Sequence, residues 1–255
     1  MNTTDLIQAL SLPDTTLLNQ RIPKKMLAEQ AAATPADRRQ IQDGVDDITW
    51  VAALKPHLIG VPAYEDAQRT YLELAIVTLK LKAGHKPGRM VELLHRAIPY
   101  PLLLLTSSDQ GLALSLSHLR HSQMEADKTV LDGELLSVNV SDTEPSAPVI
   151  NAFTAALALS RQPQASLHAL YQGWFDTIDA LAIAQHTGCF QPSLTREQAA
   201  QRHAALQQCR ELEAQLQRLH TQAQKERQLA RQVALNQELR AGQAQLQALK
   251  QQLQG

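Results

Sequence analysis

Two histidines and two cysteines, His186, Cys189, His203 and Cys209, lie near one another in the sequence and are the first residues to test for chemistry. Structural zinc takes four such ligands, which come in closely spaced pairs. The intervals between these residues match no compact zinc knuckle, and Cys209 falls on an apolar position of a helical repeat. The sequence therefore predicts a helix-end histidine and a core thiol, with no metal and no cofactor.

Acidic residues and lysines of the predicted strands were tested for nuclease chemistry. A metal-dependent nuclease of the restriction type needs an acid at a strand end and a Glu-x-Lys or Asp-x-Lys on the next strand, so that carboxylates hold Mg²⁺ while the lysine orients water. Glu73 and Lys80 lie seven residues apart in one predicted strand, and Glu134 has no lysine at the matching offset. We interpret Glu73, Lys80 and Lys82 as a solvated strand face, and no residue is assigned as catalytic.

Two groups of polar residues are candidates for docking a partner. Arg21, Lys24 and Lys25 surround a proline that keeps the chain extended, and Arg96 and Tyr100 follow an apolar helical stretch. The hydrogen-bond donors of these side chains can bind a phosphate or a carboxylate of a partner. The alternative is ordinary surface charge, because cations are also favoured at helix C-termini. Docking needs only charged side chains that extend far enough to contact the partner, whereas catalysis needs a paired acid or nucleophile.

The stretch 193–255 is rich in glutamine and carries leucines at helical spacing. A four-three repeat runs from Ala205 to Val233, but counting back from Leu253 gives a different phase. The stretch is therefore predicted to be a coiled-coil helix with a stutter or a helical hairpin. Because a lone helix would leave this seam in water, we expect it to mediate association, including possible self-association. The leucines are Leu212, Leu216, Leu219, Leu235, Leu239, Leu246, Leu249 and Leu253.

The rest of the chain alternates between helical and strand-like patterns. We predict an α+β domain at 1–140 with a small mixed or antiparallel sheet and packed helices, a linker at 141–148, and a helical segment at 149–188. Helices are expected from Thr4, from the capping motif at Thr34 to about Ile48, around 90–98, at 149–160, at 166–186 with Gly188 as C-cap, and from Thr195. Strands are expected at 50–54, 58–61, 71–82, 102–106, 112–118 and 134–140.

Charge is unevenly distributed along the chain. From residue 191 onward, nine basic residues face five acidic ones, a surplus of +4, so the overall charge of −1 leaves −5 for the preceding part. The net negative charge before residue 191 argues against broad nucleic-acid binding by the globular part. The net positive charge from residue 191 onward suits an acidic partner or a phosphate backbone. The two cysteines cannot form a disulfide framework, and neither a signal peptide nor a membrane span is evident, so we expect a cytoplasmic protein.

Several local strings resemble a bacterial domain-of-unknown-function family. They are Leu6–Leu10, Asn19–Lys25, Ile48–Pro56, Ile59–Pro62, Tyr71–Leu74 and His95–Pro101. Genes of that family tend to lie beside a Snf2-type helicase and a DNA methyltransferase like those of type III restriction systems, in antiphage defence islands. The resemblance implies an accessory subunit that assembles with the helicase or methyltransferase, and it leaves open whether DNA is contacted directly. The resemblance assigns no catalytic residues to this chain. The alternative function is an unrecognised metal-dependent nuclease or nucleic-acid-processing enzyme.

Overall fold

The computed structural model describes residues 1–32, 34–122, 129–140, 147–193 and 195–253. The chain forms two compact units, Met1–Ile178 and Asp179–Gly255. The first unit contains more than the predicted α+β domain, because helices from the predicted segment 149–188 bury their apolar side chains within it. Most of the predicted linker at 141–148 lies outside the described residues.

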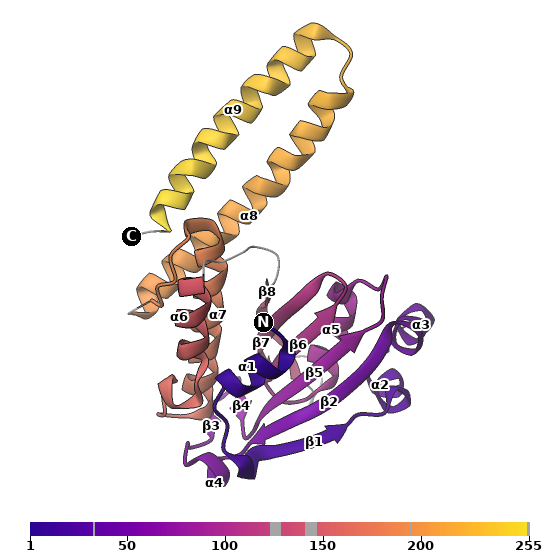
Figure 1. Cartoon of the computed structure of the whole chain (residues 1–255), viewed down its shortest axis with the longest axis vertical. Helices are drawn as coiled ribbons and strands as arrows, with labels where there is room; N and C mark the ends of the chain where they lie inside the picture. The colour runs from indigo at the N-terminus through magenta and orange to yellow at the C-terminus, as the bar shows by residue number, and fades with distance from the viewer. Residues whose placement is uncertain (33, 123–128, 141–146, 194, 254–255) are drawn as a thin grey trace. The chain divides into compact units, whose positions relative to one another are not determined.

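A mixed sheet of six strands forms the centre of the first unit, as the fold-class prediction stated (Figure 1). Its strands, in spatial order, are β1 (Leu17–Arg21), β2 (Val45–Leu54), β5 (Leu74–Leu81), β6 (Leu102–Ser108), β7 (Gly111–His121) and β8 (Thr129–Asn139). Only β5 and β6 pair in parallel, while the other neighbours are antiparallel. A second sheet pairs β3 (Tyr64–Glu65) with β4 (Thr70–Tyr71).

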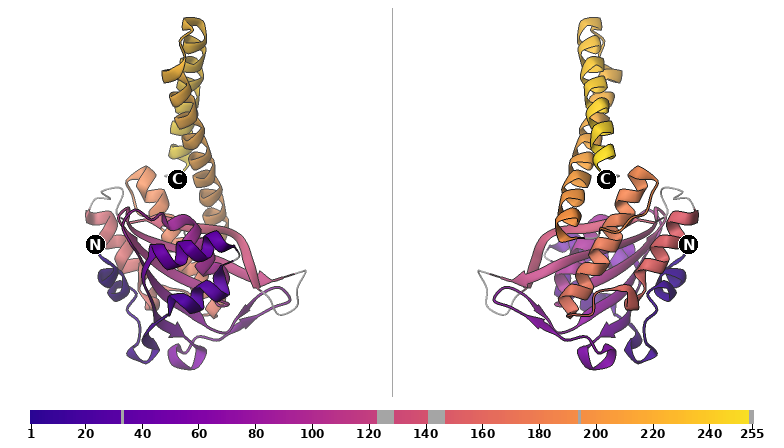
Figure 2. Two further views of the ribbon diagram at one scale, coloured as in Figure 1. Left: turned by 90° about the vertical axis from the view of Figure 1, so that its right-hand side faces the viewer. Right: turned by 90° about the vertical axis from the view of Figure 1, so that its left-hand side faces the viewer.

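Helices cover both faces of the sheet. The first unit contains α1 (Thr3–Ala9), η1 (Asp14–Thr16), α2 (Lys24–Ala31), α3 (Pro35–Gly44), α4 (Pro56–Ile59), α5 (Pro87–Ala97), α6 (Ala147–Leu157), η2 (Leu159–Arg161) and the first part of α7 (Leu167–Thr187). Figure 2 shows α2 and α3 over one face and α6 over the other. The crossover between the parallel strands β5 and β6 is α5, which supplies the connection that parallel pairing requires.

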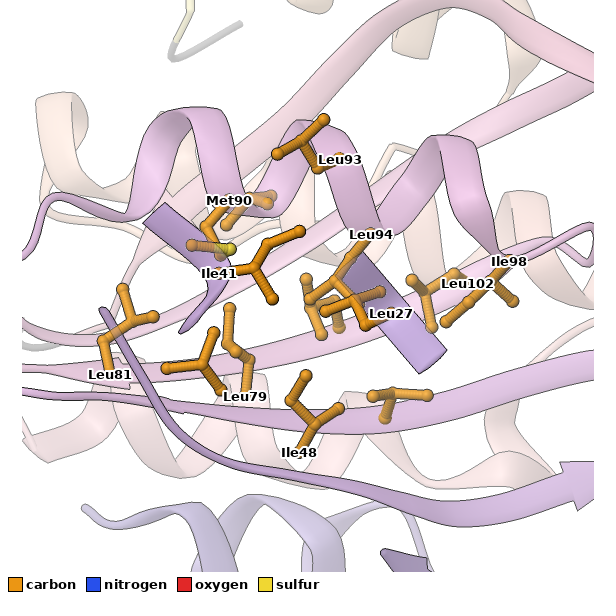
Figure 3. Close-up of a cluster of buried hydrophobic side chains, with 14 of the residues drawn as sticks. Leu27, Ile41, Ile48, Leu79, Leu81, Met90, Leu93, Leu94, Ile98 and Leu102 are labelled. Atoms are coloured by element: carbon orange, nitrogen blue, oxygen red, sulfur yellow. The ribbon is translucent and has the colours of Figure 1, made fainter. Parts of the chain in front are cut away.

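The core between the sheet and helices α2, α3 and α5 is aliphatic (Figure 3). Leu27, Ile41 and Leu94 come from the three helices and pack with Ile48 and Leu79 of the sheet. The strand β5 is buried on both sides, since its first four residues are all buried. Burial on both faces explains the change of apolar phase seen in this part of the sequence. The accompanying register shift falls in the pairing with β2, between Trp50 and Ala52.

Several predicted boundaries differ from the structure. The predicted strand 58–61 is wrong, because Pro56 begins the short helix α4 and Gly60 ends it in a left-handed conformation at φ 71°. The capping motif at Thr34 is confirmed, but its helix ends at Gly44 because β2 begins immediately afterwards. The strand β1 was missed, since it is short and its last four residues are exposed.

The second unit contains the end of α7 and a hairpin of α8 (Arg196–Lys225) and α9 (Leu229–Gln252). Gly188 ends α7 at φ 74° as predicted, and Thr195 caps α8 by accepting a hydrogen bond from the backbone of Gln198 at 3.1 Å. Of the two predicted forms of 193–255, the structure has the hairpin, and its turn precedes the conflict of heptad phases near 233–235. Within the part of the chain described, no helix is both long and apolar enough to cross a membrane.

Candidate functional site

Charged residues from three strands and a helix gather at one end of the sheet. This charged edge comprises Arg21, Lys24, Asp46, Asp47 and Lys80. The Nε of Arg21 lies 2.8 Å from Oδ1 of Asp47, and the Nζ of Lys80 lies 2.9 Å from Oδ2 of Asp46. The hydrogen bond from Lys80 lowers the pKa of the Asp46 carboxyl, and the charges of Lys80 and Lys24 act in the same direction. The charged edge therefore keeps Asp46 ionised between cations.

Two of the three predicted docking cations on this side are already engaged within the chain. Arg21 pairs with Asp47, and the ammonium of Lys24 donates a hydrogen bond to the carbonyl oxygen of Val45. Lys25 is exposed. A pocket of about 410 Å³ lies beside these groups and is lined by Arg21, Ile22, Pro23, Lys24, Asp47 and Ile48. The pocket combines both signs of charge with an apolar wall.

The acids of the charged edge were not among the sequence candidates. Sequence reasoning tested Glu73 with Lys80, but the carboxylate of Glu73 instead lies 3.4 Å from the ammonium of Lys55. Lys80 faces Asp47 across the β2–β5 ladder, so its acidic neighbours come from a strand distant in sequence. No local motif encodes that pairing. Only the register of β2 on β5 could have revealed it.

The second predicted docking group lies at the end of α5. The guanidinium of Arg96 is exposed and lies 2.7 Å from a carboxylate oxygen of Glu92, one turn earlier. The ring of Tyr100 packs edge-on against Trp50, with ring centroids 6.3 Å apart. An i,i+4 pair and an aromatic contact position both side chains, while each remains at least partly exposed.

His95, which the sequence placed beside Arg96 and Tyr100, belongs to the interior. Its side chain is buried, and its Nε2 lies 3.0 Å from the hydroxyl oxygen of Ser115 on β7. Burial lowers the pKa of His95 to about 3. The imidazole is therefore neutral and ties α5 to the sheet. His95 therefore does not join Arg96 and Tyr100 at the surface.

An aromatic and histidine cluster on the other face of the sheet was also not predicted. Its members are Tyr64, Tyr71, His118, His168, Tyr171 and Phe175. The hydroxyl of Tyr71 lies 2.5 Å from Nδ1 of His118, and burial is the main cause that lowers the pKa of His118 to about 4. The hydroxyl of Tyr171 lies 2.8 Å from the carbonyl oxygen of Leu102. These contacts fasten the first part of α7 to β6 and β7.

The predicted leucine seam of the C-terminal stretch is closed within the chain. Leu239 and Leu253 are buried, and the other seam leucines, Leu212, Leu216, Leu219, Leu246 and Leu249, are partly buried. The two helices pack tightly at Gly242, where an added Cβ would lie 2.6 Å from a methyl group of Leu216. An ion pair between Lys250 and Glu213, at 3.0 Å, joins α9 to α8. The antiparallel partner helix thus supplies the contacts that a lone helix would lack.

The turn of the hairpin exposes apolar and basic side chains together. We define the hairpin tip as residues 225–235. Within it, Leu229 is 75% exposed and Val233 is 49% exposed, while Lys225, Arg227 and Arg231 are exposed cations. A pocket of about 490 Å³ between the helix ends is lined by Gln222, Lys225, Glu226, Arg231, Ala234, Leu235 and Glu238. Exposed apolar side chains that are surrounded by charged residues are typical of a protein-binding surface.

Of the four candidate metal ligands, the two histidines pair with acidic side chains and the two cysteines are free. Cys189 is exposed and Cys209 is buried. His203 pairs with Asp179 at 2.9 Å, and His186 lies 3.4 Å from a carboxylate oxygen of Glu213. Within the described ranges, no group of three or more histidine, cysteine or acidic side chains is arranged to hold a metal ion.

Residues 10–246 match the family described as "Domain of unknown function (DUF4391)". The chain belongs to that family, since the match covers most of its length. The family assignment agrees with the resemblance to an uncharacterised bacterial family, and it carries no statement of activity. Comparisons with curated proteins and with solved structures give no match.

Proposed function

We propose that this protein is a non-catalytic accessory subunit, an adaptor, of a bacterial DNA-targeting antiphage defence complex in the cytoplasm. Its partners in this proposal are a helicase or a DNA methyltransferase, as the family resemblance implies. The α8–α9 hairpin is the docking element. The observation that carries the proposal is the hairpin tip, where Leu229 and Val233 are exposed among Lys225, Arg227 and Arg231.

The closed seam supports docking through the outside of the hairpin rather than through a shared coiled coil. In a two-stranded coiled coil between chains, the leucines of each helix would have to face a second copy. Here Leu212 and Leu216 already pack beside Gly242 of the same chain. Association therefore needs no opening of the hairpin. It requires only that a partner cover the outer faces or the hairpin tip.

The test is reconstitution with the products of the neighbouring genes. The full chain and a chain ending at residue 190 are each co-expressed with the helicase and the methyltransferase, and complexes are measured by light scattering. We expect the full chain to form a stoichiometric complex and the shortened chain to lose it. Thermal unfolding of the shortened chain, followed by circular dichroism, serves as the folding control. Equal binding by both chains would contradict docking through the hairpin, and absence of any complex would contradict the adaptor role.

A second candidate function, a metal-dependent nuclease, is favoured by the charged edge. Asp46 and Lys80 lie 2.9 Å apart on neighbouring strands, which is the kind of acid and lysine pair that such chemistry uses. The position two residues before Lys80 is Thr78, where the nuclease motif requires an acid. Asp46 and Asp47 are the carboxylates available to a Mg²⁺ ion there.

Cleavage assays separate the two functions. Supercoiled DNA and a single-stranded RNA are incubated with the protein and Mg²⁺, and the Asp46→Asn and Lys80→Gln variants are compared with the unaltered chain. The adaptor function predicts no cleavage by any of the three proteins. Magnesium-dependent cleavage that both substitutions abolish, in variants that unfold at the same temperature as the parent, would establish the enzyme instead.

A further inference from the structure

We infer that the hairpin tip binds an acidic segment of a partner protein that presents leucine-like side chains, an inference that rests on the adaptor function proposed above. Leu229 and Val233 form the apolar contact, and Lys225, Arg227 and Arg231 pair with the partner's carboxylates.

The apolar pair lies on one face of α9. Leu229 and Val233 are one helical turn apart, so their side chains project from the same side of the helix. Among the large apolar side chains of the described residues, Leu229 is the most exposed at 75%. The next leucines along the helix differ, since Leu235 is partly buried and Leu239 is buried. The amphipathic seam of α9 therefore does not account for Leu229 or Val233.

Hydrogen bonds on both sides of the turn hold this pair in a fixed position. A carboxylate oxygen of Glu226 accepts a hydrogen bond from the backbone of Gln228 at 2.8 Å. The side-chain amide of Gln232 reaches back to the carbonyl oxygen of Ala223 at 3.5 Å, which links α9 to the end of α8. An ordered turn loses little conformational entropy when it binds. The surface is thus prepared for a partner.

The adjoining pocket extends the apolar contact into the hairpin. Its volume is about 490 Å³, and Leu235 and Ala234 contribute apolar lining beside Lys225 and Arg231. A leucine or similar side chain of the partner fits between these residues, with its flanking carboxylates within reach of the two cations. Glu226 and Glu238 also line this pocket, so its walls carry both signs of charge.

The charge at the hairpin tip selects the class of partner. Three cations, Lys225, Arg227 and Arg231, outnumber the single acid Glu226 within 225–235. A second copy of this hairpin tip would bring like charges together, which disfavours self-pairing through this surface. Nucleic acid would satisfy the cations but would leave the exposed leucine and valine against a phosphate backbone. An acidic protein segment with apolar side chains satisfies both parts of the surface.

The experiment measures affinity for whichever neighbouring gene product retains the unaltered full chain. One variant removes the apolar pair, Leu229→Ala with Val233→Ala, and another reverses the charges, Lys225→Glu, Arg227→Glu and Arg231→Glu. Matched controls are Leu72→Ala, at a leucine that is 55% exposed in the first unit, and Arg218→Glu with Arg240→Glu, at exposed cations of α8 and α9 outside the tip. Affinity is measured by calorimetry at low and at physiological salt, and a duplex DNA is tested in parallel.

We expect each tip variant to weaken binding about tenfold or more, and each control to change it less than about threefold. The loss from charge reversal should be larger at low salt, whereas the loss from the apolar variant should depend little on salt. If the partner needs residues 191–255 but binds both tip variants normally, the adaptor function stands and this inference fails. If only charge reversal matters and duplex DNA binds equally well, the ligand is nucleic acid and the inference is overturned.

Discussion

The carboxylate of Asp37 accepts two hydrogen bonds from the guanidinium of Arg89, from Nε at 2.9 Å and from Nη2 at 3.0 Å. The same carboxylate also accepts the backbone hydrogen bond that completes the capping box of Thr34. One acidic side chain therefore fixes the start of α3 and joins that helix to α5. Both helices cover the aliphatic core in Figure 3, so the Asp37–Arg89 pair holds together two of the helices that pack on this face of the sheet.

The first prediction concerns the pH dependence of this pair. The hydrogen bonds from Arg89, followed by those from Thr34, lower the pKa of Asp37 from 3.8 to about 2. A lowered folded-state pKa means that the stability from this carboxylate is present above pH 3.8 and is lost as the pH falls towards 2. Asp37→Asn should lower the melting temperature at pH 7 and flatten its decline between pH 4 and pH 2. Unfolding scans of both proteins across that range measure the effect, and parallel declines would contradict it.

The second prediction concerns His95. Burial lowers its pKa from 6.5 to about 3, so the stability from its neutral form is complete above pH 6.5 and is lost as the pH falls towards 3. A single such histidine costs about 3 kcal/mol of unfolding free energy between pH 6.5 and pH 4. His95→Gln, which keeps a polar group near Ser115 but does not titrate, should reduce that loss. Urea unfolding at pH 7, 5.5 and 4 measures it, with His57→Gln, at an exposed histidine, as the control substitution.

Capping residues and apolar periodicity predicted much of the fold. Thr34, Thr195 and Gly188 marked helix ends correctly, because these signals act through the backbone within a few residues. The strands predicted at 102–106 and 112–118 are confirmed as β6 and β7, two apolar runs that pair as an antiparallel hairpin. The family resemblance is confirmed at the level of an uncharacterised family, while its link to helicases and methyltransferases remains a prediction.

The candidate sites were less predictable, because they depend on pairings between distant segments. The Asp46–Lys80 contact arises from strand register, and the Tyr71–His118 contact joins residues 47 positions apart. His95 lies beside Arg96 in the last turn of a helix, where a basic side chain usually complements the helix dipole. Ser115 on β7 instead supplies a buried partner, and no local pattern announces it.

The third prediction tests the close approach of the two hairpin helices. A Cβ at Gly242 would lie 2.6 Å from a methyl group of Leu216, so Gly242→Val must displace the Leu216 side chain from its present packing. We expect a loss of about 2 kcal/mol in the stability of the hairpin. Gly88→Val is the matched control, because no atom outside the adjacent chain and the local helix backbone lies within 4 Å of a Cβ at that helical glycine. Thermal unfolding monitored at 222 nm measures both, and equal effects would contradict close packing at Gly242.

The last prediction separates docking from structural roles among the basic residues. Arg21 and Lys24 are engaged by Asp47 and by the carbonyl oxygen of Val45, so reversing their charge places carboxylates against an acid or a carbonyl. Those two reversals should lower stability as well as binding. Lys25 is exposed, and Arg96 holds only a surface pair with Glu92, for which we expect a small contribution to stability. These two positions therefore report docking without disturbing the fold.

Lys25→Glu combined with Arg96→Glu should leave the melting temperature within a few degrees of the parent. If these cations dock a partner protein or DNA, the double variant should weaken binding about tenfold at low salt and less at high salt, because salt screens exposed charges. Binding is measured against the neighbouring helicase, the methyltransferase and a duplex DNA. Since Arg96 lies on α5 and Lys25 on α2, the two single variants show whether one helix or both carry the contact. Unchanged affinity for every one of these ligands would assign both residues to ordinary surface charge and leave the hairpin tip as the candidate docking surface.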